Sequence, residues 1–464
     1  MTLLTKLFRF QARGVERLEA FHGRALLADD PGLGKSIQML AYLDQHPEID
    51  RALVVCPAYL KYNWEGEIRK HLGLPCQLLF SKSPPRANAR KPTARIFVIN
   101  YDILYKWVPW LLRLKLGLVM LDEAHLVKHR SAKRTHAAMA LCQGDQEHGF
   151  PAIPHVICAT GTPVEQKPTE VWSLLHILHP DKFPTFQPFA RRYTNPYRAR
   201  WGWVYEGSRN EAELHQRLVD LCMIRRKKEH VLLDLPAKLT TVIPLDIRKP
   251  AKYRAAEKDI IAYLSKHDPK RVKGALRAQA LAQVSYVKRL AARLKYLNAV
   301  AWVDNQLNNG GKLLLFAIHK DMIARLKRRY RGQCVVVTGE TPPRLRKLAF
   351  DQFNKNRKIR VFIGNIDAAG TGWSAQADAV AFMELSWVPT KHTQAADRAH
   401  GLGRGIEGKR TQVFWLVAKD TFEEKLCKLL QTKQETADAI VDGGVATAGL
   451  NVFDVLCATL RGNP

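Results

Sequence analysis

A glycine-rich stretch near the start of the chain constrains the fold more than any other feature. Residues 26–36 read LLADDPGLGKS, and the apolar residues 25–28 predict a short strand that enters it. A helix-favouring run over 37–43 follows directly. In a strand–turn–helix of this kind, backbone N–H groups and the positive end of the helix converge on one point. A polyphosphate can bind there. Lys35 is then expected at the β- and γ-phosphates and Ser36 at Mg²⁺.

The stretch departs from the general phosphate-loop pattern in two places. The pattern G-x-x-x-x-G-K-[ST] has a glycine where this chain has Asp29, and Pro31 removes one backbone N–H from the loop. A glycine-rich turn that caps a helix beside a surface lysine is the alternative interpretation. As a phosphate loop, the stretch would supply these further nucleotide contacts: Asp30, Gly32, Leu33 and Gly34.

The charge of the chain indicates a polyanionic partner. Its 464 residues include 73 Lys and Arg against 43 Asp and Glu, which gives a net charge of +30 and a pI near 9.9. Nucleic acid is favoured over an acidic membrane surface, because neither a lipidation signal nor a basic amphipathic anchor is evident. No apolar run is long enough to span a bilayer. The eight cysteines form no C-x-x-C pair, so we expect reduced core residues in an intracellular protein.

Two carboxylates follow a second apolar run. Residues 118–121 predict a strand, and Asp122 and Glu123 stand at its end. Asp122 is expected to take part in the Mg²⁺ shell, while Glu123 is expected to polarise the attacking water. The apolar runs 52–56 and 96–99 alternate with helical segments. This alternation indicates a parallel sheet with ligands at the carboxyl ends of its strands.

A second α/β lobe is predicted in the C-terminal half. Its strands are expected over 313–317, 334–339 and 360–364. The turn at 308–311 is its expected start, and the middle segment 239–308 has Ala, Leu, Lys and Arg at helical spacing. That segment is either a solvated basic surface or a surface that contacts phosphate. A small-residue loop over 367–373 includes Gly370 and Gly372, which allow close approach of a phosphate to the backbone.

The motifs together resemble one family. Residues 28–36, 122–125, 160–163 and 394–400 occur in the order of the Snf-type branch of superfamily-two helicases, and the resemblance covers nearly the whole chain. It implies an α/β fold with two RecA-like parallel-sheet lobes that flank an ATP cleft and carry helical insertions.

The resemblance also implies a domain division and a function. Lobe 1 is expected over 1–235, a helical linker and protrusion over 236–308, and lobe 2 with a helical tail over 309–464. The implied function is an ATP-dependent translocase on double-stranded DNA, with ATP and Mg²⁺ as cofactors. Residues 192–193, 201–203, 225–228 and 235–238 most resemble the annealing helicases within that branch. Annealing helicases remodel or reanneal branched DNA.

Two alternatives stay open for the function. One is a helicase of the same superfamily that separates RNA or DNA strands, and the other is a weakly active DNA-binding ATPase scaffold. We expect a monomer without a recognition domain upstream of residue 10, recruited by an unidentified protein or by branched DNA itself. The expected location is the cytoplasm or nucleoid for a bacterial or viral source and the nucleus for a eukaryotic one.

Further site residues are expected from the same resemblance. Arg398 is expected to act as an arginine finger on the γ-phosphate, and a salt bridge on a helix surface is the alternative. Gly401 stands where relatives have a second arginine, and Arg404 replaces a glutamine, which makes Arg404 a candidate catalytic residue. The Gln11 amide is a candidate for an adenine edge. DNA contacts are expected from Lys61, Tyr62, Trp64, Tyr101, Thr160, Thr162 and Trp387.

Overall fold

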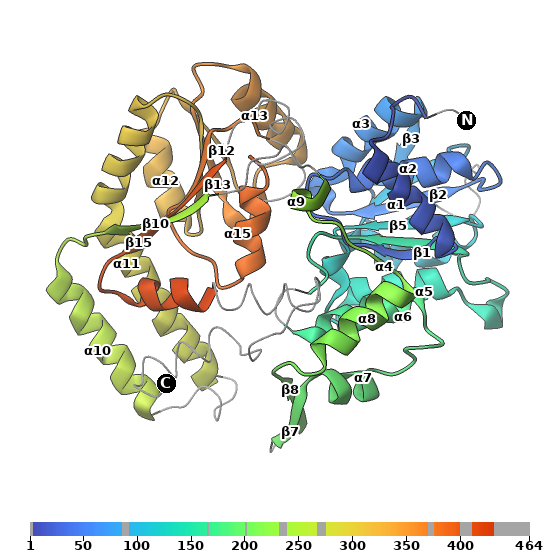
Figure 1. The fold of residues 1–464 in the computed structure, drawn as a ribbon, viewed down its shortest axis with the longest axis horizontal. Coiled ribbons are helices and arrows are strands. Elements are labelled where there is room, and N and C mark those ends of the chain that lie inside the picture. The colour runs from blue at the N-terminus through green and yellow to red at the C-terminus, as the bar shows by residue number, and fades with distance from the viewer. Residues whose placement is uncertain are drawn as a thin grey trace. The chain divides into compact units, whose positions relative to one another are not determined.

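The computed structural model contains two compact units, each organised around its own parallel sheet (Figure 1). The structure describes residues 3–85, 92–164, 167–199, 202–231, 239–266, 275–369, 375–399 and 411–430. The described residues up to 231 belong to unit 1, and those from 239 onward belong to unit 2. The predicted fold class of two parallel-sheet lobes is thereby confirmed.

Unit 1 contains a seven-stranded sheet in the order β3-β4-β2-β5-β6-β1-β9, in which every strand pair is parallel. Its strands are β1 (Arg24–Leu27), β2 (Ala52–Cys56), β3 (Cys76–Leu78), β4 (Ile96–Asn100), β5 (Leu118–Asp122), β6 (His155–Ala159) and β9 (Met223–Ile224). Every residue of β2 and β4 is buried, as expected for strands covered on both faces of a parallel sheet. The apolar runs of the sequence therefore became the central strands.

Helices cover both faces of this sheet (Figure 1). They are α1 (Arg9–Ala20), α2 (Lys35–Gln45), α3 (Lys61–Leu72), α4 (Tyr101–Leu112), α5 (Lys133–Gln143), α6 (Trp172–Leu178), α7 (Phe186–Tyr193), α8 (Glu211–Leu221) and α9 (Lys228–Val231), with short 3-10 turns η1 (Ala58–Leu60), η2 (Ala124–Val127), η3 (Gln146–His148) and η4 (Pro168–Val171). Ala25 and Leu27 share a core with α1 to α3, whereas Leu26 and Ala28 share one with α4 to α6. Successive residues of a strand point to opposite faces, which explains this division.

A two-stranded antiparallel hairpin extends from unit 1 near α7 and α8 (Figure 1). Its strands are β7 (Asn195–Ala199) and β8 (Gly202–Glu206). It forms a sheet of its own, apart from the central sheet.

Unit 2 contains a six-stranded sheet in the order β10-β15-β14-β11-β13-β12, again with parallel pairs throughout. Its strands are β10 (Leu239–Leu245), β11 (Leu313–Ala317), β12 (Cys334–Val337), β13 (Val361–Asn365), β14 (Ala379–Phe382) and β15 (Gln412–Ala418). Its helices are α10 (Pro250–Lys266), α11 (Ala275–Asn308), α12 (Lys320–Arg329), α13 (Pro343–Lys355), α14 (Ile366–Ala369) and α15 (Pro389–Ala396). Alternate residues of β11 again divide between two hydrophobic cores.

The middle segment of the chain belongs to unit 2. The sequence-based division placed 236–308 in a helical linker and protrusion. In the structure, β10 pairs with β15 over its whole length, and α11 supplies residues to both cores of unit 2. Ala291, Ala299 and Val303 are fully buried there. The turn at 308–311 lies inside unit 2, between α11 and β11. Core-facing Ala and Val among many Lys and Arg gave a basic helical pattern that concealed this packing.

Two further findings concern the cysteines and the length of the apolar helices. The seven cysteines in the described part are all free thiols, and most of them are buried. Among the residues that the structure describes, no helix combines the length and apolar character needed to cross a bilayer.

Candidate functional site

The phosphate loop connects β1 to α2 through glycines with left-handed backbone. Gly32 has φ of +88°, and Gly34 has φ of +79° and is the N-cap of α2. A side chain is strained at such angles, so the loop needs glycine at both positions. Because α2 begins at Lys35, Ser36 lies in its first turn, where backbone N–H groups have no partner within the helix. The loop therefore has the form of an anion-binding helix start.

Lys35 points back over this loop. Its Nζ donates to the backbone oxygens of Asp29 at 2.7 Å and Asp30 at 3.3 Å. Burial lowers the pKa of Lys35, and the carboxylates of Glu123 and Asp122 oppose that shift together with those of the two loop aspartates. Lys35 and the two predicted catalytic carboxylates therefore share one electrostatic environment.

Asp122 is held at the carboxyl end of β5 by two aromatic residues. The Trp64 indole Nε1 donates to Asp122 Oδ2 at 2.8 Å, and the Tyr101 hydroxyl donates to the Asp122 backbone oxygen at 2.8 Å. Burial, and then the neighbouring Glu123, raise the pKa of Asp122. Trp64 and Tyr101 are each only 2% exposed, so neither presents a surface to DNA. The expected DNA contacts at these two residues are corrected to positioning of Asp122.

Glu123 has an uncommon backbone conformation. Its φ is +51°, a left-handed value that non-glycine residues seldom adopt, and its N–H donates to Asp122 Oδ1 at 3.0 Å. Glu123 Oε2 lies 3.4 Å from His125 Nδ1, which lies 3.1 Å from Thr160 Oγ1. Residues in such conformations gather at functional sites, where the surrounding structure holds them in place.

The Thr-Gly-Thr turn after β6 is part of this arrangement. Thr160 Oγ1 accepts the N–H of Thr162 at 3.1 Å in addition to its contact with His125. Thr160 is fully buried and Thr162 is 9% exposed. The two threonines therefore connect to Glu123 through His125, and the expected DNA contacts at these hydroxyls lie in the interior of unit 1.

Asp29, which replaces the expected glycine, is engaged in a buried ion pair. Arg226 Nε donates to Asp29 Oδ1 at 2.9 Å, and Arg226 Nη2 pairs with Asp29 Oδ2. The Gln38 amide donates to Asp29 Oδ2 at 3.1 Å and accepts from Arg226 at 2.5 Å. Asp29 is fully buried. Sequence reasoning missed this cluster, although the departure at Asp29 and the paired arginines after β9 were its visible signals.

Asp30 has a similar partner. Its Oδ1 lies 2.6 Å from Arg225 Nη1, and its Oδ2 accepts the N–H of Lys228 at 3.0 Å. The carboxylate expected at the nucleotide is therefore bonded to the segment that follows β9. Leu33, another expected contact, has a fully buried side chain, so its contribution to the loop is through its backbone.

Gln11 lies beside the phosphate loop. Its Nε2 donates to the Leu33 backbone oxygen at 3.1 Å, and its Oε1 accepts from the Phe8 N–H at 3.0 Å. It is 3% exposed, and a Cβ added at Gly34 would lie 2.4 Å from its Nε2. Gln11 is therefore a buried neighbour of the phosphate loop.

Lys61 was expected at DNA, and the structure corrects this. Its side chain is 2% exposed, its Nζ donates to the Leu79 backbone oxygen at 2.5 Å, and it lies 4.6 Å from the Phe80 ring centroid. Burial lowers the pKa of Lys61. The adjacent Tyr62 is half-buried against the same ring.

Unit 2 carries the second half of the predicted site. Arg398 follows α15, is half-buried, and its Nε donates to the Gln394 backbone oxygen at 3.0 Å. Trp387 lies 4.8 Å from the Nζ of Lys288, a residue of α11 whose pKa burial lowers to about 8. Gly370, Gly372 and Arg404 lie outside the described residues.

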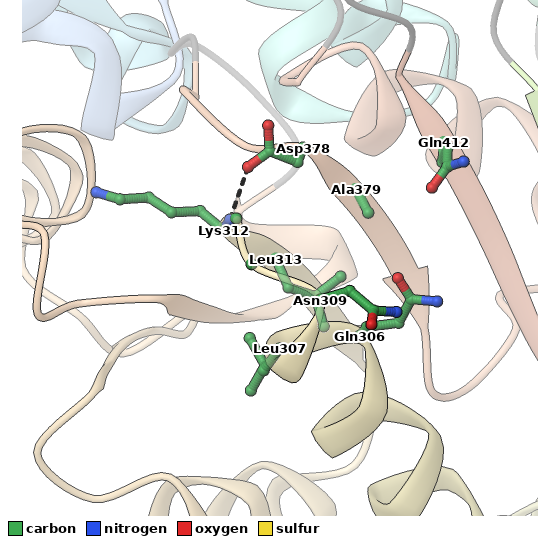
Figure 2. Close-up of a pocket in the computed structure, with 10 residues that line it drawn as sticks. Gln306, Leu307, Asn309, Lys312, Leu313, Asp378, Ala379 and Gln412 are labelled. Atoms are coloured by element: carbon green, nitrogen blue, oxygen red, sulfur yellow. Dashed lines mark hydrogen bonds between the residues drawn. The ribbon is translucent and has the colours of Figure 1, made fainter.

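A pocket of about 360 Å³ is also present in unit 2 (Figure 2). Its lining includes the first residues of three strands, Leu313, Ala379 and Gln412, and the Lys312 N–H donates to Asp378 there at 2.8 Å. The predicted motifs of unit 2 follow the carboxyl ends of strands instead. The pocket is therefore at the opposite edge of the sheet and is separate from the candidate site.

The residues of the phosphate loop and β5 fit a nucleotide with Mg²⁺. Two left-handed glycines, a lysine held among carboxylates, a hydroxyl in the first helical turn and a carboxylate at the end of β5 match the donors and acceptors of such a group. Within the described residues, His, Cys, Asp and Glu form no cluster of three that would hold a metal by themselves. Mg²⁺ usually binds through one or two carboxylates together with substrate phosphates, and Asp122 at the end of β5 is such a carboxylate.

Comparison with known proteins places the chain in a family. The SNF2-related domain matches residues 10–284, and the helicase conserved C-terminal domain matches residues 292–403. A SWI/SNF-related matrix-associated actin-dependent regulator of chromatin subfamily A-like protein 1 from Xenopus laevis is 29% identical over 93% of this chain and 44% of its own length. The DNA annealing helicase and endonuclease ZRANB3 from Mus musculus is 30% identical over 95% of this chain and 41% of its own length.

The chain thus spans less than half the length of these two relatives. Among solved structures, a Sulfolobus solfataricus SWI2/SNF2 ATPase core in complex with dsDNA aligns over 96% of this chain and 94% of its own, with 21% identity and a TM-score of 0.45. The SNF2-related domain alone covers more than half of the residues. The chain belongs to the SNF2-related family.

Proposed function

We propose that the chain is an ATP-dependent translocase on double-stranded DNA that remodels or reanneals branched DNA. The observation that carries the proposal is the shared environment of Lys35, Asp122 and Glu123 at the carboxyl edge of the first sheet. Family membership supports it, as does the similarity to a DNA annealing helicase and endonuclease. The net charge of +30 supports a polyanionic substrate.

Four residues of the candidate site in unit 1 have proposed roles in hydrolysis. Lys35 would exchange the backbone oxygens of the loop for the β- and γ-phosphates, and Ser36 and Asp122 would hold Mg²⁺. Mg²⁺ bound with the nucleotide would neutralise charge on the phosphates. Glu123 polarises the attacking water, and its strained backbone and contact with His125 orient its carboxylate.

Unit 2 supplies the remaining proposed groups. Arg398 acts as an arginine finger that stabilises charge on the transferring phosphoryl group, with Arg404 as the candidate second arginine. Gly370 and Gly372 allow a close approach to phosphate. Tyr62 in unit 1 and Trp387 in unit 2 stay as proposed DNA contacts. The protein is proposed to act as a monomer inside the cell, where free cysteines such as those of the described part persist.

ATP turnover measured side by side with duplex DNA, single strands and RNA tests the proposal. Stimulation by duplex DNA is the expected result. Stimulation by RNA or single strands alone would instead indicate a strand-separating helicase, and no stimulation by any of them would indicate a DNA-binding scaffold. Either of these two outcomes overturns the proposal.

Two variants separate the proposed roles within the site. Lys35→Ala should weaken binding of a fluorescent ATP analogue, because Lys35 contacts phosphate. Glu123→Gln should abolish turnover while the analogue still binds, because only the activation of water is lost. An equal loss of binding in both variants would show that the two roles are assigned wrongly.

A further inference from the structure

The β7–β8 hairpin exposes aromatic rings next to arginines. Trp203 is 45% exposed and Tyr197 is 43% exposed, although large aromatic side chains are highly buried on average. Arg191 and Arg198 are exposed beside them. None of these residues belongs to the nucleotide site described above.

The register of the hairpin determines which side chains share a face. Arg198 lies directly opposite Trp203, so the two side chains are on the same face, while Tyr197 lies opposite Val204 on the other face. The Arg191 guanidinium lies 5.1 Å from the centroid of the Trp203 ring. Pro196 and Tyr205 complete the Trp203 face, so the described hairpin residues place no acidic side chain on it.

The hairpin is attached firmly to the body of unit 1. The Tyr205 ring packs edge-on against Phe186 at 5.4 Å, and Phe186 packs in turn against Trp172 at 5.5 Å, a residue of the hydrophobic core. Arg192 makes a bidentate ion pair with Glu213 at 2.7 Å, just before β7. An isolated two-stranded hairpin is marginally stable in water, so the packing of Tyr205 against Phe186 is the main contact that supports the exposed rings.

We propose that this hairpin binds unpaired bases of a DNA strand at a branch. An unpaired base stacks on Trp203, and the neighbouring phosphates contact Arg191 and Arg198. The proposal rests on the proposed function in DNA remodelling and names the part of the substrate that this surface reads. Bases inside a duplex are already stacked on each other and offer no free face, so the exposed ring selects unpaired nucleotides. The described residues of this face include arginine and aromatic side chains, which suit a polyanion that carries flat rings.

Binding to three labelled DNA substrates tests the proposal: a plain duplex, a forked duplex with unpaired arms, and a single strand. Trp203→Ala should weaken binding to the fork and to the single strand by about 5-fold to 100-fold, the range expected for loss of one stacked base. Its binding to plain duplex, and its ATP turnover with plain duplex, should stay within about twofold of the parent. Trp203→Phe should keep most of the affinity, because it keeps a ring.

Tyr105→Ala is the matched control. Tyr105 is 43% exposed on α4 of unit 1, and Lys106 and Lys133 lie near its ring, so it shares the aromatic and basic chemistry but not the location. The control should bind all three substrates as the parent does. A melting temperature within a few degrees of the parent for Trp203→Ala checks that the fold is intact.

Several outcomes would overturn the proposal. Equal weakening on duplex and fork would show that Trp203 does not select unpaired bases, and no weakening on any DNA would assign the surface to another class of partner. Failure of plain duplex to stimulate the parent enzyme would overturn the proposed function instead, and that result is independent of the hairpin variants.

Discussion

At the scale of single residues, Asp122 shows how neighbours determine the chemistry of a carboxylate. Burial and Glu123 raise its pKa, while the Trp64 N–H and the charge of Lys35 oppose the rise. A carboxylate that binds Mg²⁺ must be ionised, so the Trp64 hydrogen bond supports the proposed metal-binding form. Trp64 thereby acts through Asp122 as a positioning residue.

Trp64→Phe is predicted to move the acidic limb of the pH–rate profile. The variant keeps a buried ring but removes the N–H that favours the ionised carboxylate, so the pKa of Asp122 rises further. The acidic limb of kcat/KM should shift to higher pH, and the maximal rate should fall about 10-fold to 100-fold. Tyr101→Phe, which loses a hydrogen bond to backbone only, is the control. A profile of Trp64→Phe with an unmoved limb would contradict this role.

Arg398 carries a second prediction at this scale. An arginine finger supplies about 10³ to 10⁵ in rate, so Arg398→Ala should nearly abolish DNA-stimulated ATP turnover. Arg404→Ala should be mild if Arg398 is the only finger, because a side chain displaced along the chain seldom reaches the same phosphate. Steady-state ATPase assays of both variants decide this. Turnover within a few-fold of the parent for Arg398→Ala would exclude the proposed mechanism.

At the scale of elements, the phosphate loop is tied to a segment far away in the sequence. Asp29 and Arg226 are 197 positions apart, and their buried pair joins the loop between β1 and α2 to the segment after β9. Gln38 of α2 bonds to both residues, so the loop is held from two sides. These bonds stabilise Asp29 at the loop position where the general phosphate-loop pattern has glycine.

Arg226→Met is predicted to destabilise unit 1. Removing one partner leaves the fully buried Asp29 carboxylate without its cation, which costs about 3–5 kcal/mol in comparable buried pairs. Urea unfolding monitored by circular dichroism measures the loss. Arg192→Met is the control, because its bidentate pair with Glu213 is largely exposed and should contribute less than about 1 kcal/mol. Equal effects of the two variants would show that the Asp29 pair has no special role.

At the scale of the whole molecule, the charge of +30 predicts the character of DNA binding. Each phosphate neutralised by Lys or Arg should contribute roughly −0.9 to the slope of log affinity against log salt concentration. Six to ten such contacts would lower the affinity by about 10³ to 10⁵ between 50 and 200 mM salt. Titrations of two unrelated duplexes should give nearly the same curve. A flat salt response, or strong preference for one sequence, would contradict a motor that follows the phosphate backbone.

Local patterns were sufficient to predict much of this molecule. The apolar runs became β2, β4 and β5, and the glycines of the loop adopted left-handed angles before α2, because strand burial and glycine conformation are properties of a few adjacent residues. The sequence placed the acidic pair at the end of an apolar strand, and β5 ends there. The structure brings this pair close enough to Lys35 to oppose the lowering of the Lys35 pKa.

The direction of polar and aromatic side chains was decided by partners distant in the sequence. Lys61, Trp64 and Tyr101 follow strand ends and suggested a DNA surface, yet all three turn inward to bond Leu79 or Asp122. The basic pattern of α11 likewise concealed its packing in unit 2. A side chain faces solvent or the interior according to which hydrogen-bond acceptors and apolar surfaces the fold brings within reach, and those come from other elements of the chain.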